Sequence, residues 1–599
     1  MLVHDYDTPT TLHGSGTTDF AATDVGVSAN VVNGHTVETP VVNDKHNGFV
    51  SEEVPLGEPR RLRVICIGAG ATGLNLAYML PRHLKNIDLL MYEKNEAIGG
   101  TWLENRYPGI ACDIPAHIYQ FTWAPNPTWS EFYASGPEIL RYFQDTAKKF
   151  DLEKYVNLKH RVTRAEWNED DGTWMLEILN EETQQTMTDY CHFLINGSGF
   201  LNHWTFPKIP GLHSFKGPLM HTANWDNDVP LENQKIGLIG NGSSGIQLLT
   251  AIQPVAKHLT TFIRSPTWIT TVYLQDYAGP GGSNFEYTPE QIEKYKKNPE
   301  EYLNYRKAME SDMSGSFDIS FKDSDFQQMA RQYLTEQMKK RLGEDHPLSQ
   351  NLIPDFSVGC RRLTPGTGYL EALTQSNVTV ERTPIARVVP EGIELENGEL
   401  VELDLLACAT GFDVSWAPRF PIIGRKGINL QEEWSKTRAS AYMALGVPNF
   451  PNYTLFLGPG GPLSHGSALP SIEHQTKYIA RLLYKMQIEG YKAAVPSQAA
   501  TQDFISHMHK FNERTVWSGD CNSWFKGGVK ENKPLCHPGS RTHWFHMLTE
   551  PRWEDWDWER LSENRFSYLG NGWTTWEKKG QDLSYYLDDP DSGYQSLRY

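Results

Sequence analysis

Cysteine is scarce in this chain, and no two cysteines are spaced as a redox pair. The 599 residues contain seven, at positions 66, 112, 191, 360, 408, 521 and 536, with no C-x-x-C arrangement among them. That absence argues against a disulfide reductase. The N-terminus has neither the basic region nor the apolar region of a secretion signal, so we expect reduced thiols and a cytoplasmic location.

Positive charge and long apolar runs are also lacking. Lysine and arginine number 55 against 73 aspartates and glutamates, which gives a net charge of −18. Because no dense basic run occurs, we expect no nucleic-acid partner. No stretch approaches the roughly 18 uninterrupted apolar residues of a membrane span, so we expect no membrane partner. The histidines are scattered without cysteine or carboxylate sets at ligand spacing, and no metal site is predicted.

A glycine-rich turn opens the first segment with clear structure. An apolar run at 61–67 leads into Gly68-Ala-Gly70-Ala-Thr-Gly73, and a second apolar run at 87–92 ends at Glu93. Strand, glycine turn, helix and strand in this order predict a βαβ unit. The glycines allow close approach of a pyrophosphate, and Glu93 is placed to accept hydrogen bonds from a ribose diol. A dinucleotide site is predicted here; a glycine turn without a ligand is the alternative.

The same pattern restarts near residue 235. A strand at 235–239, a helix near 244–255 and a strand at 259–263 surround a second glycine turn, and the last strand ends in Arg264 rather than in an acid. A guanidinium binds a 2′-phosphate by charge-assisted hydrogen bonds, which favours NADPH over NADH. A solvated surface arginine is the alternative. The residues assigned to this second site are Gly240, Gly242, Ser243, Ser244, Gly245, Arg264 and Ser265.

Two such units in one chain predict an α/β fold with two Rossmann-like domains, the second inserted into the first. Helical spacing near 286–345 predicts an insertion in the second domain, Glu396-Asn-Gly398 predicts a hairpin, and a helix is expected at 470–488 after Pro470. The tail from 540 onward, rich in tryptophan and tyrosine, is expected to be loop-like. The predicted boundaries are 1–58 for a partly disordered extension, 59–205 and 409–530 for the first domain, 206–408 for the second with its insertion at about 275–355, and 531–599 for the tail.

Three further motifs resemble those of Baeyer–Villiger monooxygenases, flavoenzymes that insert oxygen next to a ketone carbonyl. Residues 215–226 read Phe-x-Gly-x-x-x-His-x-x-x-Trp-Asp, residues 99–113 read Gly-Gly-Thr-Trp-x-x-x-x-Tyr-Pro-Gly-x-x-x-Asp, and residues 409–413 read Ala-Thr-Gly-Phe-Asp. One short motif can match by chance, but these three occur in the family's order, and the resemblance extends over roughly 61–530.

The resemblance implies the roles of several residues. The first glycine turn would bind FAD and the second NADPH, and the catalytic arginine carries over to Arg362 with Asp113 as its carboxylate partner. An ion pair that only braces the domain interface is the alternative for these two. His221 belongs to the linker between the two domains, so we expect a conformational role for it and not a catalytic one. The other carried-over cofactor contacts are Thr101, Trp102 and Tyr119 for the flavin, Arg361 beside Arg264 for the 2′-phosphate, and Trp524 in the loop that closes over the nicotinamide.

The resemblance also implies a reaction. NADPH would reduce FAD, O₂ would add to give a C4a-peroxyflavin, and this nucleophile would attack a ketone to give an ester or lactone. The long insertion and tail favour cyclic or polycyclic ketones, and we expect a monomer. An N- or S-oxidising flavin monooxygenase shares the plan of two sites and is the nearest alternative. A non-catalytic protein that senses NADPH is a second one, against which the presence of both Arg362 and Asp113 argues.

Overall fold

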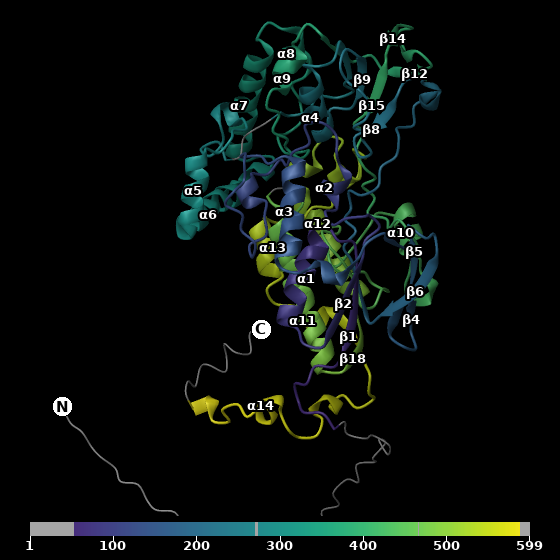
Figure 1. The fold of residues 1–599 in the computed structure, drawn as a ribbon, viewed down its shortest axis with the longest axis vertical. Coiled ribbons are helices and arrows are strands. Elements are labelled where there is room, and N and C mark those ends of the chain that lie inside the picture. Colours follow the sequence, from purple (N-terminus) through teal and green to yellow (C-terminus); the bar gives the residue numbers. More distant parts are fainter. Residues whose placement is uncertain (1–52, 270–273, 465, 588–599) are drawn as a thin grey trace, which may run out of the picture. The chain divides into compact units, whose positions relative to one another are not determined.

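The computed structural model describes residues 53–269, 274–464 and 466–587 (Figure 1). The expected N-terminal extension therefore falls largely outside the described residues, as does the end of the tail. The described remainder of the extension pairs with the tail: Pro55 forms a β-bridge with Gly570, and Leu56 forms one with Thr574. Within the described part of the chain, no helix has both the length and the apolar character needed to cross a membrane.

The first parallel sheet is assembled around β1. Its strands are apolar on both faces, as in Leu-Arg-Val-Ile-Cys-Ile of β1, because helices cover the sheet. Helix α1 (Ala71–His83) connects β1 to β2 and packs against α11 (Ala468–Ile488). The strand order is β17 (Tyr453–Leu455), β7 (Phe193–Asn196), β1 (Leu62–Ile67), β2 (Ile87–Tyr92) and β3 (Val156–Asn157), all parallel.

The second parallel sheet comes from residues between β7 and β17, so the second unit is inserted into the first, as predicted. Helix α4 (Ser243–Ile252) follows its central strand, and α9 (Tyr369–Leu373) packs on α4. In Figure 1 the labels β8, β9 and β15 mark this sheet, and β1 and β2 mark the first. The strand order is β11 (Val378–Glu381), β10 (His258–Phe262), β9 (Lys235–Ile239), β15 (Leu405–Cys408) and β8 (Leu219–His221).

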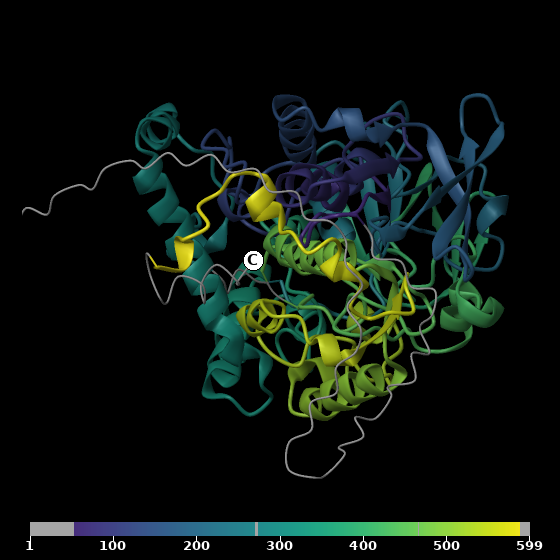
Figure 2. The same ribbon diagram turned by 90° about the horizontal axis from the view of Figure 1, so that it is seen from below.

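The predicted helical insertion and the predicted hairpin are both confirmed. Capping supports the insertion helices: the Thr288 side chain accepts from the Gln291 amide, and Ser324 accepts from the Gln327 amide. The insertion helices, teal to green in Figures 1 and 2, are α5 (Pro289–Lys297), α6 (Pro299–Gly315), α7 (Asp325–Leu342) and α8 (Pro347–Asn351). The hairpin belongs to the antiparallel sheet β12 (Ile385–Val389), β13 (Gly392–Leu395) and β14 (Leu400–Glu402).

Two further sheets flank the first unit. The elements are β16 (Ile422–Ile423), β4 (His160–Asn168), β5 (Thr173–Asn180) and β6 (Thr186–Cys191) in one sheet, and β18 (Tyr491–Pro496) with β19 (Trp556–Arg560) in the other. The remaining helices are α2 (Thr101–Glu104), α3 (Gly136–Lys149), α10 (Leu430–Lys436), α12 (Gln498–Asn512), α13 (Arg541–Met547) and α14 (Thr575–Lys578).

The expectation of a loop-like tail is wrong. Strand β19 pairs antiparallel with β18, and the Trp556 indole donates to the Tyr478 hydroxyl at 3.0 Å. The alternation of tryptophan with acidic residues in β19 makes a strand only once β18 is beside it, and that partner lies some sixty residues earlier. Helix α11 likewise begins at Ala468, two residues before Pro470, because proline is tolerated within the first turn of a helix.

The expectation that all thiols are reduced is also wrong. Cys360 and Cys521 form a disulfide, with their Cα atoms 6.4 Å apart. The spacing of 161 residues carries no sequence signal for this pairing. The free cysteines, all buried, are Cys66, Cys112, Cys191, Cys408 and Cys536.

Candidate functional site

The first glycine turn lies at the carboxyl end of β1, between strands β2 and β7, where a parallel sheet opens a binding crevice. Gly68 has φ +101°, and a Cβ added there would lie 2.9 Å from the Gly197 carbonyl oxygen. A Cβ on Gly73 would lie 2.5 Å from the Gly68 carbonyl oxygen. Helix α1 begins after Gly70 without a side-chain cap, so its first amides are available to a phosphate.

Glu93 is buried at the end of β2 and faces this turn. Its carboxylate accepts hydrogen bonds from the Ala69 amide at 2.8 Å and the Asn95 amide at 2.9 Å. Each carboxylate oxygen keeps a further lone pair, so the side chain that orders the turn still has acceptors for a ribose diol.

The first half of the 99–113 motif packs against the glycine turn. Gly100 has φ +53°, and a Cβ on it would lie 2.9 Å from the Gly70 Cα, so the two backbones touch. Trp102 is buried in α2 and donates from its indole to the Tyr119 hydroxyl at 3.3 Å, with the rings edge to face. Thr101 begins α2 and remains exposed. The three predicted flavin contacts therefore gather beside the first turn.

The second half of the same motif docks on helix α4 of the second unit. A Cβ on Gly109 would lie 2.7 Å from the Gln247 carbonyl oxygen, so only glycine allows this approach. The Tyr107 hydroxyl donates to the Gln247 side chain at 2.7 Å, and Gln247 donates to the Ala111 carbonyl at 2.9 Å. Gln247 therefore joins the two units, a role that no sequence signal revealed.

The second glycine turn repeats the first at the end of β9. Gly240 has φ +109°, and a Cβ on Gly245 would lie 2.2 Å from the Gly240 carbonyl oxygen. A Cβ on Gly242, by contrast, would meet no atom within 4 Å. Ser243 begins α4 and shares a hydrogen bond with the Thr364 hydroxyl at 2.7 Å, and Ser244 follows it in the first turn. The open face at Gly242 is the space that a pyrophosphate needs.

These two glycines predict different outcomes on substitution. Gly245→Ala is expected to destabilise the fold by about 1–3 kcal/mol, because its methyl group overlaps the turn. Gly242→Ala is expected to leave stability within about 0.5 kcal/mol, because it meets only open space, yet to weaken NADP⁺ binding. Thermal unfolding without nucleotide and NADP⁺ titration separate the two effects. Wild-type NADP⁺ affinity in Gly242→Ala would contradict this placement of the pyrophosphate.

Arg264, Ser265 and Arg361, assigned to the 2′-phosphate, lie close together. The Arg361 guanidinium donates to the Ser265 hydroxyl at 3.1 Å and lies over the Phe356 ring at 5.0 Å. Its Nε is buried without a partner. Burial, and then the charge of Arg264, lower the pKa of Arg361. In the described residues neither guanidinium has an ion pair with a carboxylate, so the pair would gain from an anion such as a 2′-phosphate.

Arg362 and Asp113 meet in a bidentate ion pair. The Arg362 Nε lies 2.5 Å from one Asp113 oxygen and an Nη lies 2.8 Å from the other, although the residues are 249 positions apart. Burial lowers the pKa of Arg362, but the charge and hydrogen bonds of Asp113 outweigh it and raise the pKa above its usual value. The guanidinium is therefore a permanent cation, and three of its five N–H donors are not used by Asp113.

The 215–226 motif is tied to the 409–413 motif by one hydrogen bond at the end of strands β8 and β15. The His221 Nδ1 accepts from the Ala223 amide at 3.1 Å, so Nε2 carries the proton and faces the Thr410 hydroxyl at 3.2 Å. Thr410 belongs to the 409–413 motif, so the histidine joins two of the three motifs. Burial lowers the pKa of His221 to about 4, which leaves it neutral near pH 7. A structural role is consistent with that geometry.

The loop carrying Ser523 and Trp524 packs near the ends of both units. Trp524 lies against Phe200, with ring centroids 5.4 Å apart, and the Ser523 hydroxyl accepts from the Phe525 amide at 3.2 Å. A small cleft beside Arg361 is lined by the insertion, by the segment 359–363, by the residues just before the Ser523 loop and by the loop after β17. The lining residues are Ile319, Ser320, Gly359, Arg361, Leu363, Ser464, Val516 and Trp517.

Known proteins share this arrangement. A family model described as an NAD(P)-binding Rossmann-like domain matches residues 66–135. The FAD-binding monooxygenase tazF of Aspergillus terreus is 39% identical over 536 residues, covering 88% of this chain and 95% of that protein. The chain belongs to the FAD-binding monooxygenases, in the Baeyer–Villiger family. A Baeyer–Villiger monooxygenase of Pseudomonas aeruginosa is 29% identical over 522 residues, covering 85% of this chain and 94% of that one.

Solved structures agree with this membership. Cyclohexanone monooxygenase from Rhodococcus sp. Phi1, bound to NADP⁺, superposes with a TM-score of 0.72 at 26% identity, covering 84% of this chain and all of that one. The present chain accordingly uses FAD and NADPH, as predicted from its two glycine turns. The helix amides left without a side-chain cap at both turns fit the pyrophosphates of those two cofactors.

Proposed function

We propose that this monooxygenase inserts one oxygen atom next to the carbonyl of a cyclic or polycyclic ketone and releases an ester or lactone. The observation that carries the proposal is the bidentate pair of Arg362 with Asp113, which fixes a permanent cation at the junction of the two units. The long insertion, which reaches Arg361 through Ile319 and Ser320, is the feature that favours a bulky substrate.

FAD would be held by residues 59–205 and 409–530, and NADPH by residues 206–408 with their insertion. The first glycine turn and Glu93 would bind the FAD pyrophosphate and ribose, and Thr101, Trp102 and Tyr119 would line the flavin. When bound, FAD supplies the redox chemistry: it accepts two electrons from NADPH and delivers one oxygen atom of O₂. The chain supplies binding, orientation and charge.

Arg362 would stabilise negative charge on the reacting oxygen atoms. Asp113 occupies one edge of its guanidinium, and the three remaining N–H donors are free to point at the substrate carbonyl. A fixed cation needs no reorganisation when charge develops, so each well-placed donor contributes about 3–4 kcal/mol to the rate. Because the guanidinium stays charged at any working pH, it cannot donate a proton to the oxygenating group.

Arg264, Ser265 and Arg361 would bind the 2′-phosphate of NADPH, and Trp524 would cover the nicotinamide end. Burial is the main cause of the lowered pKa of Arg361 and the charge of Arg264 the second, and an anion beside the two guanidinium groups would offset both effects. Once the nucleotide is in place, the 518–530 loop and the insertion would exclude water, which otherwise diverts the oxygen to hydrogen peroxide.

A substrate panel with NADPH and O₂ tests this function. We expect cyclic and fused-ring ketones to stimulate NADPH consumption, with ester or lactone as the main product and hydrogen peroxide as the minor one. The panel includes a thioether and a tertiary amine, because an N- or S-oxidising monooxygenase would convert these instead. Sulfoxide or N-oxide formation with no ester from any ketone would contradict the proposal.

A further inference from the structure

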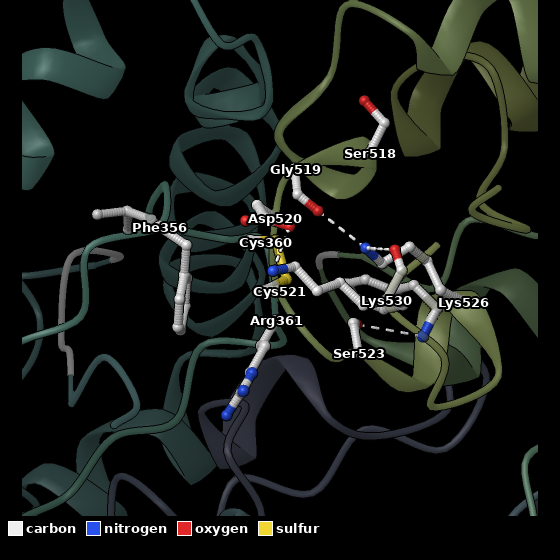
Figure 3. Close-up of a disulfide and its surroundings, with 12 residues drawn as sticks. Phe356, Cys360, Arg361, Ser518, Gly519, Asp520, Cys521, Ser523, Lys526 and Lys530 are labelled. Atoms are coloured by element: carbon white, nitrogen blue, oxygen red, sulfur yellow. Dashed lines mark hydrogen bonds and ion pairs between the residues drawn. A yellow bond between two sulfur atoms is a disulfide. The ribbon is translucent and has the colours of Figure 1, made fainter. Parts of the chain in front are cut away.

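The disulfide Cys360–Cys521 joins two segments that both reach the proposed cofactor site. Cys360 directly precedes Arg361 and Arg362, and Cys521 lies two residues before Ser523. Both sulfurs are buried, since the exposed fractions of the two residues are 0% and 2%. Figure 3 shows the sulfur–sulfur bond between the two backbones, with the Arg361 side chain directed away from the loop.

The arginine segment is held in place independently of the disulfide. Buried Gln327 of α7 accepts from the Val358 amide at 2.9 Å and donates to the Val358 carbonyl at 3.0 Å. On the other side of Cys360, Arg361 is bonded to Ser265 and Arg362 to Asp113. Cys360 is therefore a fixed anchor.

The loop of residues 518–530 is closed by its own hydrogen bonds and is also held by Arg438, which donates to the Lys526 carbonyl at 2.9 Å, and by the Leu535 amide, which donates to the Phe525 carbonyl at 2.9 Å. Buried Lys526 donates to the Gly519 carbonyl at 2.8 Å and the Lys530 carbonyl at 2.6 Å, and Lys530 pairs with Asp520 at 2.6 Å (Figure 3). Among the hydrogen bonds and ion pairs of the described residues, none joins 519–526 to 356–363. The loop behaves as one closed unit whose bond to the arginine segment is the disulfide.

The other thiols are poorly suited to redox chemistry. Burial raises the pKa of Cys66, Cys112, Cys191 and Cys536 well above the usual range and that of Cys408 to about 12. The reactive form of a thiol is the thiolate, so these five remain inert near pH 7. Cys360 and Cys521 form the one disulfide among the seven cysteines, so redox chemistry at sulfur in this chain falls on that pair.

We propose that Cys360–Cys521 is an oxidative modification site that tethers the loop carrying Trp524 to the arginine segment and thereby controls NADP⁺ retention. The oxidised chain keeps the loop closed over the nucleotide. The reduced chain lets the 518–530 unit open, and NADP⁺ leaves faster. The effect on NADP⁺ rests on the proposed roles of Arg361 and Trp524, whereas the tether itself does not.

Hydrogen peroxide, the product of uncoupled turnover, is a sufficient oxidant. One thiol attacks peroxide, the O–O bond breaks, and a sulfenic acid and one water molecule form. The second thiol then displaces a second water molecule from that sulfur, and the S–S bond forms. In the reverse direction, a dithiol reductant cleaves the S–S bond by exchange, gains a disulfide itself and leaves two protein thiols.

Thiol counting and limited proteolysis of the FAD-loaded enzyme test the tether. After peroxide treatment, alkylation in denaturant is expected to label five cysteines, and after dithiothreitol all seven. Trypsin cleavage after Lys526, which is 1% exposed, is expected to be about tenfold faster in the reduced enzyme, because the loop opens locally. Seven labelled thiols after peroxide, or equal cleavage rates, would overturn the inference.

Two variants separate the disulfide from other effects of the reductant. Cys521→Ser is expected to behave as reduced wild type under all conditions, with the NADP⁺ dissociation constant raised about tenfold by loss of the tether. Cys536→Ser, which removes a nearby buried thiol, is expected to keep the response to dithiothreitol. A response to dithiothreitol in Cys521→Ser, or oxidised-like NADP⁺ affinity in that variant, would overturn the role of the disulfide.

These readouts do not depend on the oxygenation reaction. If the loop responds to redox state but no ketone is converted, the tether stands and the proposed function fails. If ketones are converted and dithiothreitol changes neither the rate of loop cleavage nor NADP⁺ affinity, the proposed function stands and the tether fails.

Discussion

Arg362→Ala is expected to lower the rate of ketone oxygenation by about 10²–10³-fold, or roughly 3–4 kcal/mol. The alanine removes the cation that would stabilise charge on the reacting oxygen atoms and leaves Asp113 without its bidentate partner. Reduction of FAD by NADPH is expected to continue, because the glycine turns and the arginines of the proposed 2′-phosphate site are untouched. NADPH is then consumed with hydrogen peroxide as the main product.

Stopped-flow absorbance measures flavin reduction, and product analysis measures ester against peroxide in the same variant. Arg362→Lys keeps the charge but not the planar fork, so we expect only partial recovery. Arg387→Ala is the matched control, because Arg387 also donates two hydrogen bonds to a carboxylate, both to one oxygen of Glu394 on the β12–β13 hairpin, away from both glycine turns. Ester formation by Arg362→Ala at the wild-type rate would contradict the catalytic assignment. A variant in which only the reduction of FAD by NADPH is slowed, with the ratio of ester to peroxide unchanged, would contradict it as well.

Arg361→Ala is expected to raise the dissociation constant of NADPH by about 10–100-fold, because a hydrogen bond to a charged group contributes about 1.5–3 kcal/mol. Affinity for NADH is expected to change little, since NADH has no 2′-phosphate for the arginine to bind. The ratio of the two affinities therefore falls, although the folded chain itself is relieved of repulsion between Arg361 and Arg264.

Titration of the oxidised enzyme with NADP⁺ and NAD⁺, and steady-state kinetics with NADPH and NADH, measure this discrimination. Ser265→Ala offers a graded comparison, because it removes only the hydroxyl that accepts from Arg361 at 3.1 Å. An equal loss of affinity for both nucleotides would mean that Arg361 shapes the site generally and does not recognise the phosphate.

The fold was predictable wherever local pattern and tertiary environment agree. Residues 61–93 and 235–264 combine apolar runs with glycines at fixed spacing, and both formed the predicted βαβ units. The insertion helices carry their own capping residues, and Asn397-Gly398 closes the predicted hairpin. Where a partner strand decides the structure, as for β19, the tail was misread because local preference is weak there.

The sequence by itself determined the two glycine turns, the order of the motifs and the residue types at the candidate site. Local sterics and charge explain why: Gly68 and Gly240 need positive φ, and Arg264 replaces an acid. Only the tertiary structure decided which distant residues meet. It bonded Tyr107 to Gln247 and joined Cys360 to Cys521. It also gave a bidentate geometry to the pair of Arg362 and Asp113, which the family resemblance had implied. These contacts depend on how the two units pack, and packing between distant surfaces leaves no periodic pattern in the chain.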